Sequence, residues 1–89
     1  MNELRSEVQV FAEEMEKVLA ANDHKPGWKL KGVAYLLGCL LAEVAELKEA
    51  LSHFTEEEVL RETIDVANFA MMIADVCGLL KSRATHGEV

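Results

Sequence analysis

Two apolar stretches, placed symmetrically about Phe54, limit the folds open to this 89-residue sequence. They run from Gly32 to Ala42 and from Val66 to Val76, and Asp75 is the only charged residue in either. A short connection at Phe54 would place two helices side by side and antiparallel. Helices that are apolar nearly all round must be covered on more than one side. We therefore predict an antiparallel helix hairpin that associates into a dimer or larger homo-oligomer.

Apolar residues recur at spacings of three and four along most of the chain, which is typical of amphipathic helices. The first run predicts a helix from about Glu3 to Ala21, and the Pro26-Gly27 dipeptide indicates a loop after it. A second helix is expected from about Leu30 to His53. The fold class is therefore all-α: a small helical bundle built on the hairpin and an N-terminal amphipathic helix, completed by oligomerisation.

The expected start of the third helix follows directly after Phe54. Thr55 is a suitable N-cap, and Glu58 would complete a capping box with it, so the helix should begin near Glu56. Gly78 should weaken the helix. The last residues, Ser82 to Val89, are expected to be a frayed tail of a single domain that spans residues 1–89.

Composition and charge exclude several classes of protein. The formal net charge of −7 argues against a nucleic-acid or anionic-membrane surface, since both need a cationic face. No uncharged run reaches the ~20 residues needed to cross a bilayer, and the N-terminus does not have the pattern of a signal peptide. Cys39 and Cys77 lack CxxC spacing, so we expect buried free thiols and a cytoplasmic protein.

Two pairs of carboxylates flank the predicted turn. Glu43 and Glu46 lie three residues apart, as do Glu62 and Asp65, and such neighbours share one helix face. The two pairs are equally far from Phe54, so an antiparallel hairpin would bring them to one level. Converging carboxylates repel one another unless a cation compensates them. The pattern predicts a Mg²⁺ site, with Mn²⁺ as a possible substitute.

Two other interpretations of these acids remain. They are either solvated surface groups, with Asp65 balanced by Arg61, or part of a di-iron carboxylate bundle. The bundle needs Glu-x-x-His on two helices, whereas residue 50, three before His53, is alanine. Two pairs mirrored about one turn and embedded in apolar segments favour the metal site over surface acids.

With these motifs, the chain resembles the MazG-like family of all-α nucleotide pyrophosphohydrolases. The resemblance covers about Leu30 to Cys77 and rests on the family's ExxE…ExxD pattern, here Glu43-Val44-Ala45-Glu46-Leu47 followed by Glu62-Thr63-Ile64-Asp65-Val66-Ala67-Asn68. The segments 22–28 and 68–75 are similar to short phage-associated members described as dATP/dGTP pyrophosphohydrolases.

The resemblance implies hydrolysis of a (d)NTP to (d)NMP and pyrophosphate by a metal-activated water, in nucleotide-pool housecleaning and with purine dNTPs as candidate substrates. It also implies a homo-dimer or tetramer. We expect Glu43, Glu46, Glu62 and Asp65 to bind one or two Mg²⁺ ions, and Glu46 to double as general base.

Candidate substrate contacts lie near these acids and in the loop. Asn68 is suited to bond a phosphate or sugar hydroxyl, or else to make a helix-to-helix hydrogen bond. Trp28 is suited to stack on a base, or to pack at the entry to the second helix. Lys29 and Lys31 are expected to meet phosphates, and His24 to meet base or phosphate.

Two alternatives to an enzyme follow from the same residues. One is a non-enzymatic helical dimerisation or adaptor module whose acids are only surface charge. The other is a catalytically inactive relative that binds nucleotide as a sensor. A rise in melting temperature with Mg²⁺ that Glu46→Gln abolishes would separate the first alternative from the enzyme.

Overall fold

The computed structural model describes residues 3–81, and all regular structure in that range is helical. Helix α1 spans Ser6–Ala21, α2 spans Val33–His53 and α3 spans Glu56–Val76. Residues 79–81 are helical again. The all-α prediction is confirmed, whereas the expected tail at residues 82–89 lies outside the described part.

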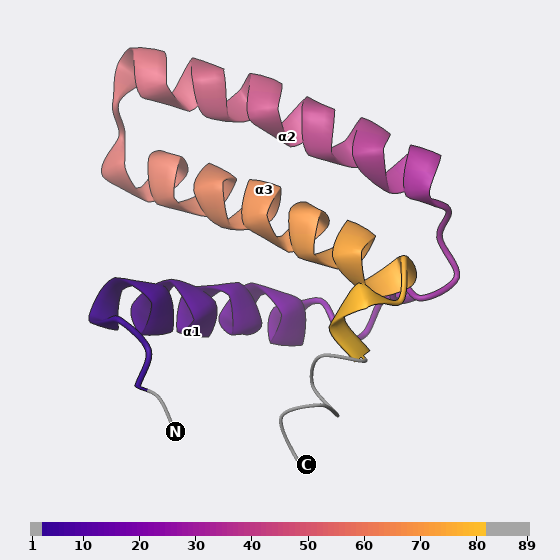
Figure 1. Cartoon of the computed structure of the whole chain (residues 1–89). Coiled ribbons are helices and arrows are strands. Elements are labelled where there is room, and N and C mark those ends of the chain that lie inside the picture. Colours follow the sequence, from indigo (N-terminus) through magenta and orange to yellow (C-terminus); the bar gives the residue numbers. More distant parts are fainter. Residues whose placement is uncertain (1–2, 82–89) are drawn as a thin grey trace.

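Helix α3 is the middle layer of the fold (Figure 1). It packs against α2 on one side and against α1 on the other, and within residues 3–81 α1 makes no direct packing contact with α2. The helices carry few completely buried apolar side chains: Leu36 from α2, Ala50 from α2 and Ile64 from α3. This small core lies at the α2–α3 boundary.

Helix α1 begins three residues later than predicted and ends at the predicted residue. Its apolar stripe has half-buried members, Phe11, Met15, Val18 and Leu19, whereas Leu4 and Val8 are exposed. Asn22 is the C-cap of the helix, and its side-chain amide donates a 3.0 Å hydrogen bond to the carbonyl oxygen of Val18.

Helix α2 begins at Val33 rather than at the predicted Leu30. The Lys31 amide donates to the Trp28 carbonyl oxygen at 2.9 Å, so residues 28–31 form a turn before the helix. Leu30 is almost fully exposed. Gly32 is the N-cap, and its carbonyl accepts the first helical hydrogen bond from Leu36.

The chain reverses at Phe54 and Thr55. Phe54 has a φ of 50° and caps α2 in the left-handed conformation, with its amide bonded to the Ala50 carbonyl. Thr55 occupies the predicted N-cap of α3, but its side chain makes no capping hydrogen bond. The predicted capping box between Thr55 and Glu58 is therefore wrong, although the predicted start of the helix is right.

A stripe of exposed apolar side chains runs along α2. Its members recur at helical spacing and are each between 43% and 59% exposed: Val33, Leu37, Leu41, Val44 and Leu51. We call this set the α2 stripe. It lies on the side of α2 that neither α1 nor α3 covers, because the buried Leu36 and Ala50 mark the face that packs against α3.

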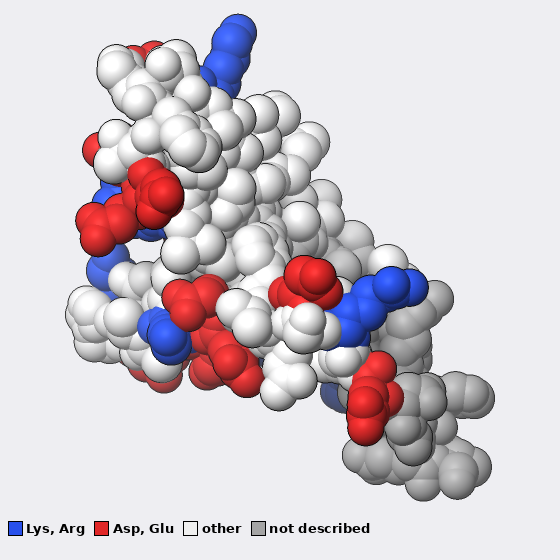
Figure 2. Space-filling view, turned by 90° about the vertical axis from the view of Figure 1, so that its left-hand side faces the viewer, with Lys and Arg blue, Asp and Glu red and all other residues white. Residues whose placement is uncertain are grey.

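Charged side chains on the face in Figure 2 are spread out among neutral atoms, and the basic ones do not gather into one patch. None of the helices in residues 3–81 is long and apolar enough to span a membrane.

Both cysteines are free, as predicted, but Cys77 is exposed and Cys39 only half-buried, so the prediction that both are buried is wrong for Cys77. Cys77 is the C-cap residue of α3.

Candidate functional site

Three of the four predicted ligands come together between α2 and α3. Glu43 projects from α2, and Glu62 and Asp65 project from α3, with one carboxylate oxygen of each within 4.8 Å of the others. Glu62 is 6% exposed, and the other two are half-buried. We call these three residues the carboxylate cluster.

Glu46 is exposed and lies outside the carboxylate cluster. The reason is rotational. The face of α2 that packs on α3 contains Leu36, Glu43, Leu47 and Ala50 at spacings of three, four and seven residues. Glu46 is rotated about 60° from Glu43 around the helix axis, since each residue adds about 100°. The equal height of Glu46 and Glu62 about the turn is therefore not enough to bring their carboxylates together.

Burial and like charges make the carboxylate cluster electrostatically unfavourable without a cation. Burial raises the pKa of Glu43 to about 7, and the adjacent carboxyl of Glu62 and the charges of Asp65 and Glu46 act in the same direction. The pKa of Asp65 is also raised by burial and by Glu62, while Arg61 opposes the rise. The arrangement favours a shared proton or a bound cation over three free carboxylates.

Two oxygens of the carboxylate cluster are buried and have no hydrogen-bond partner: Oε1 of Glu43 and Oε1 of Glu62. Arg61 approaches the other oxygen of Glu62 at 3.8 Å from its own exposed position. Buried polar atoms are normally satisfied, so a proton or a cation is expected to partner these oxygens. Three converging carboxylates fit a hard divalent cation, which takes oxygen ligands.

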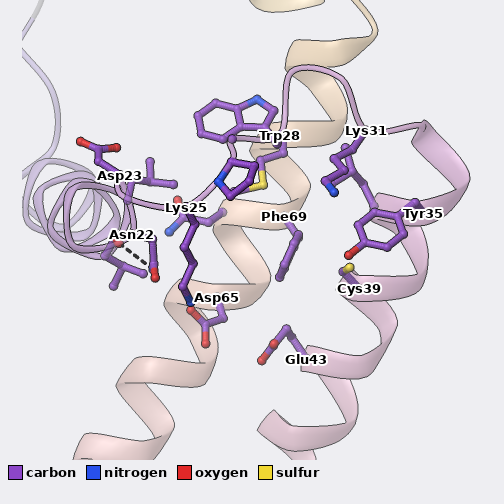
Figure 3. Close-up of a pocket in the computed structure, with 17 residues that line it drawn as sticks. Asn22, Asp23, Lys25, Trp28, Lys31, Tyr35, Cys39, Glu43, Asp65 and Phe69 are labelled. Carbon is purple, nitrogen blue, oxygen red and sulfur yellow. Dashed lines mark hydrogen bonds between the residues drawn. The ribbon is translucent and has the colours of Figure 1, made fainter.

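A cavity of about 730 Å³ adjoins the carboxylate cluster, and Glu43 and Asp65 are part of its wall (Figure 3). Its opposite wall is the loop after α1. The aromatic side chains Trp28, Tyr35 and Phe69 line it together with the cations Lys25 and Lys31. The remaining lining residues are Val18, Leu19, Asn22, Asp23, Pro26, Gly27, Leu36, Cys39, Asn68 and Met72.

Part of the helical lining follows the same mirror about position 54 as the acids, since Cys39 and Phe69 are each 15 residues from it. Tyr35 and Cys39 precede Glu43 by whole multiples of four residues on α2, and Phe69 follows Asp65 by four on α3. Figure 3 shows the Tyr35 hydroxyl beside the Cys39 sulfur, and this contact raises the pKa of Tyr35. Sequence reasoning missed these three residues, although stepping along each helix from its carboxylate would have found them.

Asn68 is 3% exposed, and its two polar atoms have different surroundings. The amide nitrogen donates a 3.3 Å hydrogen bond to the carbonyl oxygen of Met15 in α1, which confirms the predicted helix-to-helix bond. The amide oxygen is buried without a partner, and Asn68 lines the cavity. A ligand donor would satisfy this oxygen.

The structure separates the loop residues that were predicted to bind substrate. Trp28 and Lys31 line the cavity, and the Lys31 ammonium lies over the Tyr35 ring at 5.1 Å. Lys29 is not part of the lining and pairs with Asp75, and His24 is exposed outside the lining. The expected contacts of Lys29 and His24 with phosphate or base are therefore not supported by their positions.

Lys25, rather than Lys29, lines the cavity together with Lys31. It precedes Pro26-Gly27, where the chain turns, and its amide donates to the Asn22 carbonyl at 2.9 Å. Helical spacing cannot locate a residue in such a loop, so no simple signal in the sequence distinguishes Lys25 from Lys29.

Taken together, the site offers buried oxygen ligands, aromatic surfaces and two cations around one cavity. Those features suit a ligand with a polyanionic end and a flat apolar end. No protein-family model, curated protein or solved structure matches the chain.

Proposed function

We propose that this protein is a Mg²⁺-dependent hydrolase that splits a nucleoside triphosphate into a monophosphate and pyrophosphate. The observation that carries the proposal is the carboxylate cluster, with its two unpartnered buried oxygens, in the wall of a cavity of about 730 Å³. That volume is within the range of ~300 to 1,000 Å³ found for small-molecule sites. The ExxE…ExxD resemblance to MazG-like pyrophosphohydrolases supports the same reaction.

Glu43, Glu62 and Asp65 would hold the cation. An all-carboxylate ligand set suits Mg²⁺ or Mn²⁺ better than softer metals, because it offers only hard oxygen atoms. Bound there, the cation would lower the pKa of a water and neutralise phosphate charge. Three protein ligands leave coordination positions for water and substrate.

Glu46 would serve as a general base rather than as a ligand. It is exposed one helical turn from Glu43, and its charge contributes to the raised pKa of that residue, so the two carboxylates are within electrostatic reach. A base that is not bound to the cation remains free to accept a proton from water. We assign Glu46 this role.

The rest of the cavity would hold the nucleotide. Lys25 and Lys31 supply positive charge for the phosphates. Trp28 and Phe69 offer aromatic faces for a base, and Asn68 Oδ1 can accept a hydrogen bond from a sugar hydroxyl. Purine deoxynucleotides, and with them nucleotide-pool housecleaning, are the first candidates because of the family resemblance.

A homo-oligomer belongs to the same proposal. The α2 stripe exposes apolar side chains at helical spacing, and the core of the single chain contains few fully buried residues. Burying such a stripe against another copy would stabilise a domain of this length, which has limited surface to bury. Leu41→Lys should then shift light-scattering mass toward the monomer, whereas Glu49→Gln, at an exposed position of the same helix outside the α2 stripe, should not.

The test of the reaction is product analysis with all canonical NTPs and dNTPs, in Mg²⁺ or in EDTA. The wild type should release monophosphate and pyrophosphate only with the metal. Glu62→Gln should lose both metal binding and turnover, while Glu46→Gln should keep metal binding and lose turnover. Glu16→Gln, an exposed glutamate of α1, is the matched control.

Each contrary outcome has a defined meaning. Diphosphate and orthophosphate as products would keep the metal site but place the cleaved bond elsewhere. Nucleotide binding without turnover would indicate an inactive, nucleotide-sensing relative. If the protein binds neither metal nor nucleotide, the helical association module becomes the better hypothesis.

A further inference from the structure

Asp75 joins the loop wall of the cavity to the end of α3. Its Oδ2 atom accepts a 2.9 Å hydrogen bond from the indole Nε1 of Trp28 and a 2.6 Å bond from the ammonium of Lys29. The Asp75 side chain is only 18% exposed, although the Lys29 side chain is 70% exposed. Both donors act on one oxygen, so the two bonds fix neighbouring loop residues at one point.

The contact reaches across a long stretch of sequence. Trp28 and Asp75 are 47 residues apart, whereas backbone hydrogen bonds of the loop, such as Lys25 to Asn22 and Lys31 to Trp28, are local. Local bonds shape a turn but do not set its position relative to a helix. The bonds to Asp75 do set that position.

Trp28 is the member of this group that lines the cavity, and neither Asp75 nor Lys29 is part of the lining. The Lys29 ammonium also lies 5.2 Å from the centre of the Trp28 ring, which adds a cation–π contact to the ion pair. The indole is thus held through its N–H by Asp75 and through its ring by Lys29. Its orientation in the cavity wall depends on groups that a ligand does not touch.

We propose that Asp75 is a positioning residue that fixes Trp28 in the cavity wall and so sets the affinity of the cavity for its ligand. Its effect on nucleotide affinity rests on the proposed function, whereas its effect on Trp28 does not. Asp75 acts through the indole of Trp28. It is not a member of the carboxylate cluster, so its substitution should leave metal binding unchanged.

Trp28 is the only tryptophan of the chain, so tryptophan emission reports on the surroundings of this one indole. Asp75→Ala removes the acceptor, Asp75→Asn keeps an oxygen for the indole but loses the charge, and Lys29→Met removes only the cation. We expect Asp75→Ala to shift emission to longer wavelength and to increase acrylamide quenching. Asp75→Asn should remain near the wild type, and Glu16→Ala should be indistinguishable from it.

Enzyme kinetics with Mg²⁺ and dATP supply the second readout. Asp75→Ala should raise KM about tenfold, as expected for a lost hydrogen bond to a charged group, with kcat within about twofold. The Mg²⁺-induced rise in melting temperature should be unchanged in all Asp75 variants. That metal response also shows that a variant is folded.

Unchanged emission and quenching in folded Asp75→Ala would overturn the proposal, whatever the kinetics. A changed emission with unchanged KM would overturn its effect on affinity. If the wild type hydrolyses no triphosphate, the proposed function fails, and acrylamide quenching still decides whether Asp75 positions Trp28.

Discussion

The carboxylate cluster should make the metal-free protein less stable as the pH rises from about 4.5 to 7. Burial and neighbouring acids raise the pKa of Glu43 from 4.5 to about 7 in the folded chain. Well below pH 4.5 Glu43 is protonated in both the folded and the unfolded state, so the burial of its carboxyl does not reduce the free energy of unfolding. Between the two values the folded state binds more protons than the unfolded state, and stability falls with rising pH.

The size of the effect follows from the same two values. A rise from 4.5 to about 7 corresponds to at most about 3 kcal/mol, at about 1.4 kcal/mol for each pH unit. Glu43 is only half-buried in the cavity wall, so solvent screening reduces this to about 1 to 2 kcal/mol. For a domain of this length, the melting temperature should fall by about 5 to 15 °C.

Thermal melts followed by circular dichroism, at constant protein concentration and in EDTA, test this at a series of pH values. Glu43→Gln should flatten the decline and be more stable than the wild type above pH 7, whereas Glu16→Gln should decline like the wild type. The raised pKa of Asp65 adds a residual slope of the same sign. The lowered pKa of Asp75 acts only as the pH falls below 3.8, outside this window.

Equal slopes in the wild type and Glu43→Gln would refute the electrostatic account of the carboxylate cluster. A decline that Mg²⁺ does not remove at pH 8 would refute the cation as its compensation. This second outcome would refute the role of the cation even if Glu43 titrates as described.

Three further predictions concern the metal, the core and the turn. Mg²⁺ at about 100 times its Kd should stabilise the wild type by about 2.7 kcal/mol in thermal melts and leave Glu62→Gln unchanged. Leu36→Ala should lower the free energy of unfolding by about 2 to 5 kcal/mol in urea titrations, because Leu36 is 1% exposed. Phe54→Gly should raise that free energy by about 0.5 to 1 kcal/mol, since Phe54 is exposed and has a φ of 50°; a loss would show that the Phe54 ring has a packing role.

Hydrophobic periodicity was sufficient to locate the helices because burial on one face is a property of local sequence. The predicted ends at Ala21 and His53 and the predicted start at Glu56 agree with the structure. The start of α2 was three residues too early. Leu30 continues the apolar pattern, but the turn at residues 28–31 is held by Trp28, whose partner is Asp75 on α3.

The candidate site was predictable where it depends on helical spacing and not where it depends on packing phase. Equal distance from Phe54 matches Glu43 with Asp65, as the structure has them, but it says nothing about rotation, and Glu46 lies outside the carboxylate cluster. The residues of the loop wall were harder still to predict from the sequence. Nothing in the spacing of Lys25 and Lys29 indicates which of them lines the cavity.

Helix α3 carries successive parts of the site in the order of its sequence. Glu62 and Asp65 belong to the carboxylate cluster, Asn68 binds α1 while lining the cavity, and Asp75 holds the loop wall. The helix that occupies the middle of the fold thus places polar groups where a small protein would otherwise place core residues. Buried acids cost stability unless they are compensated. A bound cation and an additional copy against the α2 stripe would each offset that cost, so on this account metal affinity, association and folding stability are thermodynamically linked and should change together when Glu62 is altered.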